Sequence, residues 1–112
     1  MDHVPREVSP AELAAQIAAG RAPYVLDVRS TREYRQGHVP GAAHVPFWLL
    51  PLRMDLVTAG PEDPVVIYCG HGPRAQFART VLERRGYRRV MLLAGHMSGW
   101  RRARLPINST DT

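Results

Sequence analysis

The one cysteine of the sequence, Cys69, stands in a segment whose residue types could support nucleophilic chemistry at sulfur. An apolar run, 64–68, precedes it, and a glycine-containing loop and a segment with helical spacing, 74–85, follow it. Open α/β sheets bind ligands at the carboxyl ends of their strands, and the N-terminus of a following helix directs unpaired N–H groups at such a site. We therefore predict that Cys69 is a nucleophile held in an anion-binding loop.

The residues after the cysteine have types that would hold a negatively charged sulfur. Gly70 and Gly72 allow the backbone to curl so that N–H groups converge on one point, and Pro73 suits the first turn of a helix. Arg74 adds a positive charge that would orient an anionic substrate, and these features together favour thiolate over thiol. His71 is expected to line the loop, because a thiolate needs no general base. The predicted binding loop comprises Gly70, His71, Gly72, Pro73, Arg74 and Ala75.

The alternative for Cys69 is a structural role. A free cysteine is usually a small buried hydrophobic residue without chemistry. The immediate succession of strand, glycine loop, arginine and helix N-terminus favours the nucleophile instead.

Two charged residues near the end of another apolar run are expected to support the site. Asp27 is predicted to brace the fold by hydrogen bonds rather than to take part in chemistry. Arg29 is predicted either to line the rim of the site or to pair with Glu33. His38 and His44 have no obvious third ligand, so packing roles are expected and no metal site is predicted.

Helical and strand-like segments alternate along the chain, which predicts a parallel α/β sheet. Ser9, Pro10 and Glu12 form an N-terminal helix signal with Val8 as the apolar residue before the cap, and Gly20 is the expected stop. Shorter helices are expected over 30–36, 74–85 and about 97–101. Strands are expected over 24–28, 42–45, 64–68 and 90–93. The apolar segment 47–57 is expected to be helical and broken at Pro51.

Length and composition indicate one globular domain over residues 1–112, with a core at about 8–107 and short polar tails. No apolar run reaches the ~18 residues that span a bilayer, and the first ten residues lack the features of a secretory signal. A single cysteine excludes an internal disulfide framework, a CxxC redox pair and a multi-cysteine zinc site. A cytoplasmic protein without membrane association is therefore expected.

The net charge of +5 raises the question of nucleic-acid binding. The arginines cluster over 84–89 and 101–104, beside expected helix ends and without interleaved stacking aromatics. We interpret them as a solvated basic surface, which also attracts small anions or an acidic protein. No nucleic-acid partner is predicted.

The segment around the cysteine resembles the active-site loop of rhodanese domains. In that family four residues separate the cysteine from a frequent arginine with a small residue after it, and Cys69, Gly72, Arg74 and Ala75 fit this pattern. Asp27-Val28-Arg29 resembles the family's Asp-x-Arg. The stretches 33–42, 93–100 and 105–106 also resemble its motifs in the right order, so the resemblance covers about 8–107. One departure is His96, an expected turn residue, where the family usually has a second glycine.

The resemblance implies a mostly parallel five-stranded sheet with helices on both faces, and sulfurtransferase activity. The Cys69 thiolate would take the outer sulfur of a small anionic donor such as thiosulfate and pass it from a persulfide to cyanide, a thiol or a protein acceptor. No cofactor is implied. The sequence sets no oligomeric state.

Two other functions remain open. Rhodanese domains resemble cell-cycle dual-specificity phosphatases in fold, but a cysteine phosphatase or arsenate reductase has a loop longer by one residue, which gives phosphate more room. A non-catalytic rhodanese-like module that binds or regulates a partner commonly lacks the cysteine, whereas this chain keeps it.

Overall fold

A computed structural model describes residues 5–110 of the chain as a five-stranded sheet with helices on both faces. The strand order is β1-β5-β4-β2-β3, and every pairing between these strands is parallel, where a mostly parallel sheet was predicted. The strands are β1 (Glu7–Val8), β2 (Tyr24–Asp27), β3 (Ala43–His44), β4 (Val65–Tyr68) and β5 (Val90–Leu93). The central strands β4 and β5 are the apolar runs that the sequence indicated.

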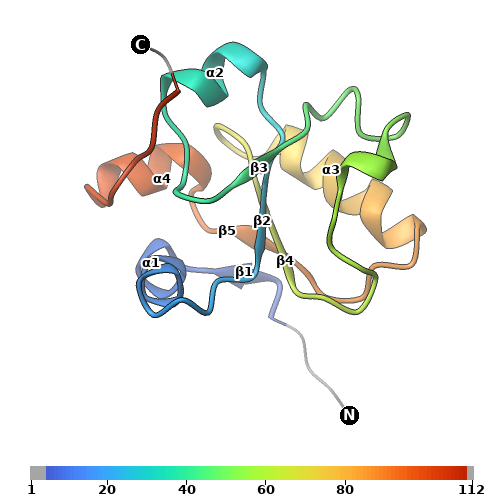
Figure 1. The fold of residues 1–112 in the computed structure, drawn as a ribbon, viewed down its shortest axis with the longest axis horizontal. Helices are drawn as coiled ribbons and strands as arrows, with labels where there is room; N and C mark the ends of the chain where they lie inside the picture. The colour runs from blue at the N-terminus through green and yellow to red at the C-terminus, as the bar shows by residue number, and fades with distance from the viewer. Residues whose placement is uncertain (1–4, 111–112) are drawn as a thin grey trace.

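The helices divide between the two faces of the sheet. They are α1 (Pro10–Ala18), α2 (Thr31–Gln36), α3 (Pro73–Arg84) and α4 (His96–Arg102), with a 3₁₀ turn, η1 (Met54–Leu56). One core cluster contains Ala78 and Leu82 of α3, and the other contains Leu13 of α1 and Trp100 of α4. Figure 1 shows the same division, with α3 on one side of the sheet and α1 and α4 on the other. The predicted fold class is confirmed.

Capping side chains fix where the first two helices begin. Ser9 Oγ accepts a hydrogen bond from the N–H of Glu12, and the Glu12 carboxylate accepts one from the N–H of Ser9. Ser30 and Glu33 make the same reciprocal pair at the start of α2. Each box satisfies N–H groups that a helix start otherwise leaves unpaired. The second box also places Glu33 at the end of the sheet where β4 ends.

The sequence missed one strand, and one local prediction was wrong. Strand β1 was not anticipated, because two residues are too few to show a period; Val8 is held by its pairing with Leu93 of β5. The segment 47–57 forms turns and only the short η1, where a broken helix was expected. Pro51 cannot donate a backbone hydrogen bond, and the apolar side chains of this segment, such as Leu50, pack separately on the core.

No helix within residues 5–110 combines the length and apolar character needed to cross a bilayer. A single domain over 1–112 stays a prediction. The ends of the predicted tails, 1–4 and 111–112, lie outside the described residues.

Candidate active site

Cys69 lies directly after the central strand β4 and four residues before Pro73, the first residue of α3. The chain passes through Gly70 and His71 to Gly72, which is the N-cap of α3. Gly72 has φ +142°, a backbone conformation that strains any residue with a Cβ. The loop 69–72 therefore lies at the carboxyl end of a buried parallel strand and at the N-terminus of a twelve-residue helix.

The sulfur of Cys69 is buried and receives a backbone hydrogen bond. Gly72 N–H donates to Sγ at 3.0 Å, and the thiol is free. The residue is 0% exposed and packs in the same cluster as Ala75 of α3. A reagent therefore reaches Sγ only when the loop moves. The alternative of a buried hydrophobic cysteine describes the packing of this residue but leaves the N–H aimed at its sulfur unexplained.

The first turn of α4 anchors the loop from the other side. Met97 N–H donates to the carbonyl of Cys69 at 2.9 Å, and Ser98 N–H donates to the carbonyl of Gly70 at 3.3 Å. The N–H of Cys69 in turn donates to Nδ1 of His96 at 3.2 Å. The sequence predicted a turn residue at His96 and no contact with the cysteine loop. The only unusual feature in the sequence was a histidine where the resembling family usually has glycine, and this does not indicate where the side chain points.

The remaining residues of the predicted loop differ in exposure. His71 and Pro73 are exposed, Gly70 and Arg74 are partly buried, and Ala75 is buried. Exposed His71 thus lies on the outside of the loop. Ala75 contributes packing rather than a polar contact.

Arg74 pairs with Glu33 of α2. The guanidinium donates from Nη1 to Oε1 at 2.7 Å and from Nη2 to Oε2 at 3.1 Å. The hydrogen bonds with Glu33 raise the pKa of Arg74, and those from Arg74 lower the pKa of Glu33 from 4.5 to about 2. The guanidinium also lies over Gly70, with Nη2 3.1 Å from the place of a Cβ there. The positive charge beside the loop is therefore partly balanced by a carboxylate.

Acid should remove the stabilisation that the Arg74–Glu33 pair provides. Because folding lowers the pKa of Glu33 from 4.5 to about 2, the contribution is present above pH 4.5 and disappears as the pH falls toward 2. Both side chains are about one-third exposed, so we expect at most ~1 kcal/mol. In urea unfolding, Glu33→Gln should differ from wild type near neutral pH and converge with it in acid.

Glu12→Gln is the matched control, since it alters the same type of capping box, and Glu12 forms no ion pair with an arginine of residues 5–110. A Glu33→Gln difference that stayed constant from neutral to acidic pH would contradict the role of the ion pair.

Asp27 and Arg29 form a buried pair behind the site, so the prediction that Arg29 lines the rim or pairs with Glu33 was wrong. Nε of Arg29 lies 3.1 Å from Oδ1 of Asp27, and Nη2 donates to Oδ2 at 2.8 Å. Arg29 is 4% exposed and also donates to the carbonyl of Gly37 at 2.7 Å. Burial alone would lower the pKa of Arg29, but the hydrogen bonds and charge of Asp27 raise it. Asp27 makes the kind of hydrogen bonds that the sequence led us to expect, and its bracing role stays a prediction.

Tyr68, the last residue of β4, joins this network. Its ring lies 5.5 Å from Cζ of Arg29, and its hydroxyl accepts the N–H of Val39 at 3.0 Å. Burial and then the charge of Asp27 raise the pKa of Tyr68 above its ordinary value of 10.0. The residue before the cysteine is therefore tied to the loop that follows α2.

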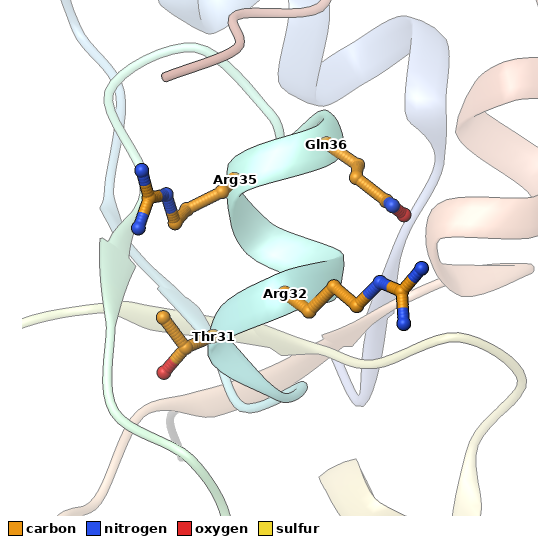
Figure 2. Close-up of a pocket in the computed structure, with 4 residues that line it drawn as sticks. All are labelled: Thr31, Arg32, Arg35 and Gln36. Atoms are coloured by element: carbon orange, nitrogen blue, oxygen red, sulfur yellow. The ribbon is translucent and has the colours of Figure 1, made fainter. Parts of the chain in front are cut away.

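A surface hollow elsewhere on α2 is shown in Figure 2. Arg32 and Gln36 point to one side of the helix, and Thr31 and Arg35 point to the other. No thiol lines this hollow, so it is separate from the chemistry at Cys69. Among residues 5–110, no cluster of three or more His, Cys, Asp or Glu side chains is arranged to hold a metal ion.

Comparison with known proteins agrees with the fold. The rhodanese-like domain model matches residues 9–103. A sulfurtransferase of Allochromatium vinosum is 36% identical over 102 residues, covering 90% of this chain and 92% of that protein. The thiosulfate sulfurtransferase GlpE of Haemophilus influenzae is 28% identical, covering 94% of this chain and 96% of its own. The structure of the human single-domain sulfurtransferase TSTD1 superposes with a TM-score of 0.74 at 29% identity, covering 87% and 96% of the two chains.

A parallel α/β domain with a cysteine loop between its central strand and a helix defines the class of protein. The chain belongs to the rhodanese-like domain family. Its sulfurtransferase relatives support a sulfurtransferase role.

Proposed function

We propose that the chain is a sulfurtransferase that carries sulfane sulfur as a persulfide on Cys69. The donor is thiosulfate or a persulfide, and the acceptor is cyanide, a small thiol or a cysteine of a protein. The observation that carries the proposal is the N–H of Gly72 directed at Sγ from the N-terminus of α3. A backbone donor and the positive end of a helix dipole stabilise negative charge on sulfur. The names of the relatives support the choice of sulfur as the transferred group.

The reaction proceeds in two half-reactions. The Cys69 thiolate attacks the outer sulfur of thiosulfate, a new S–S bond forms, and sulfite leaves with the electron pair of the bond that breaks. An acceptor thiolate then attacks the outer sulfur of the persulfide, and the Cys69 thiolate leaves. Each half-reaction conserves charge and needs no external oxidant or cofactor. Ping-pong kinetics are expected.

The loop supplies binding rather than proton transfer. Gly70 and Gly72 let the backbone curl around the sulfur, and Pro73 starts the helix that directs its N–H groups there. Arg74, held by Glu33, gives the rim a positive charge that attracts an anionic donor. Exposed His71 forms the outer wall of the loop.

Access to the sulfur requires the loop to open, because Cys69 is 0% exposed. Gly70 and Gly72 have no Cβ, so they give the loop between β4 and α3 more conformational freedom than other residues would. A single thiol suits a reducing compartment, so the proposal places the reaction in the cytoplasm.

Intact-protein mass measurement tests the function directly. The protein is incubated with thiosulfate or glutathione persulfide, and excess donor is removed. Its intact mass is then measured before and after addition of cyanide. We expect a gain of one sulfur atom that cyanide removes as thiocyanate. Protein whose thiol is blocked beforehand, with alkylation verified by mass, is the control. An unblocked thiol that gains no sulfur from either donor would favour the non-catalytic binding module. Phosphate release from an aryl phosphate would favour the phosphatase.

A further inference from the structure

His96 lies in a backbone conformation that its own side chain disfavours. It begins α4 with φ +54°, directly after Gly95 at φ +74°. Left-handed backbone is strained for a residue with a Cβ, whereas glycine adopts it readily. The side chain is also largely buried, at 7% residue exposure. A buried histidine in left-handed backbone indicates that its imidazole ring makes a contact that offsets the strain.

The ring of His96 touches both ends of the cysteine loop. Nδ1 accepts the N–H of Cys69 at 3.2 Å, which requires an unprotonated Nδ1 and leaves the proton of the neutral ring on Nε2. At the other end of the loop, Nε2 and Cδ2 lie 3.5 and 3.8 Å from the place of a Cβ on Gly72. The imidazole therefore lies against both Cys69, which bears the sulfur, and Gly72, whose N–H points at that sulfur.

We propose that His96 is a positioning residue that holds the cysteine loop in the arrangement that directs the N–H of Gly72 at the sulfur. The carbonyl of Cys69 is fixed by Met97 N–H and its own N–H by His96, so the peptide groups on both sides of its Cα are held. This orientation determines where Sγ lies relative to Gly72. The inference rests on the proposed function for its catalytic meaning, but the contacts themselves concern the thiol alone.

Protonation of His96 should release the loop. An imidazolium carries a hydrogen on Nδ1, which would face the N–H of Cys69 and remove the acceptor. Burial lowers the pKa of His96 below 6.5; the charge of Glu7 on β1 opposes this, and His71 on the loop reinforces it. The neutral ring therefore predominates above pH 6.5, and the contact disappears as the pH falls below that value.

Two variants at this position separate positioning from a simple turn role. His96→Gly relieves the backbone strain but removes the acceptor of the Cys69 N–H. His96→Asn keeps a side-chain oxygen that can accept this N–H, and asparagine tolerates left-handed backbone. If the residue only made a turn, glycine would serve at least as well as histidine.

The measurement is the rate of Cys69 alkylation by iodoacetamide as a function of pH, together with sulfite release from thiosulfate. For His96→Gly we expect faster alkylation of Cys69, because Sγ is buried until the loop moves, and kcat lowered about ten- to a hundredfold, since small misplacements of a reacting group have effects of this size. His96→Asn should recover most of both values. Wild type should show an additional fall in kcat for sulfite release below pH 6.5 that His96→Asn lacks.

The outcomes distinguish a positioning role of His96 from a simple turn role. Alkylation needs no sulfur donor, so it tests the loop contact even if the wild-type chain transfers no sulfur. Thermal unfolding of each variant is measured alongside, so that a variant that fails to fold is recognised and His96→Asn then carries the test. A His96→Gly variant that is folded and matches wild type in both alkylation rate and kcat would overturn the inference. So would a glycine and an asparagine variant with equal defects.

Discussion

Replacing Cys69 with serine should lower the rate of sulfite release from thiosulfate at least about a thousandfold, because removal of a covalent nucleophile leaves only binding. A serine hydroxyl remains un-ionised near neutral pH and forms no stable persulfide equivalent. Its Oγ can still accept the N–H of Gly72 that now reaches Sγ at 3.0 Å. The geometry of the loop is thus kept while the chemistry is removed. Sulfite release is followed with a dye, under saturating thiosulfate and cyanide.

Folding must be checked in the same variant, since the cysteine lies in an apolar cluster and is 0% exposed. Burying a hydroxyl there should reduce the free energy of unfolding by about 1–3 kcal/mol, which urea titration measures. Cys69→Ala, which buries no hydroxyl, serves as the second variant and should be equally inactive. Residual sulfite release near the wild-type rate in either variant would remove Cys69 from the mechanism.

The sequence predicted the strand and the helix that flank the cysteine because their signals are local. The run 64–68 contains β4, and the helix expected over 74–85 begins one residue earlier, at Pro73. Ser9 caps α1 through contacts three residues away. In each case the residues that determine the structure are neighbours in the chain, so a pattern of residue types is sufficient.

The parts that were missed depend on contacts between distant segments. The sequence suggested Arg29 as a partner of Glu33, and the fold pairs Glu33 with Arg74 instead, 41 residues away. His96 lies 27 residues from the N–H that it accepts. Only the arrangement of α2 and α4 around the end of β4 brings these side chains to the loop, and residue spacing does not encode that arrangement.

The buried pair of Asp27 and Arg29 lies at the end of β2, beside the strand β4 that leads to the cysteine, and its effect on stability should be large. Asp27 ends β2 beside Tyr68, the residue before the cysteine, and both side chains of the pair are almost fully buried. Asp27→Ala would leave a guanidinium in the interior without its carboxylate. Breaking a buried ion pair from one side costs about 3–5 kcal/mol, a large part of the ~5–15 kcal/mol that stabilises an ordinary domain. Urea unfolding at neutral pH measures this loss.

The chain offers a matched control for this prediction. Arg53 and Asp55 are also an arginine and an aspartate two residues apart with two short hydrogen bonds, at 2.9 Å each, but they are exposed. Asp55→Ala removes the same carboxylate from the same type of pair in water, where it should change stability little. The contrast between the two variants isolates burial as the cause.

Removing both charges of the buried pair should restore part of the lost stability. Asp27→Ala combined with Arg29→Met leaves no unpaired charge inside, and methionine keeps much of the apolar volume of the arginine stem. We therefore expect the double variant to unfold at a higher urea concentration than Asp27→Ala alone. It should still be less stable than wild type, because the carbonyl of Gly37 loses the donor that Arg29 now supplies at 2.7 Å. If Asp27→Ala were no more destabilising than Asp55→Ala, or if the second substitution lowered stability further, the pair would not brace the strands through its charges.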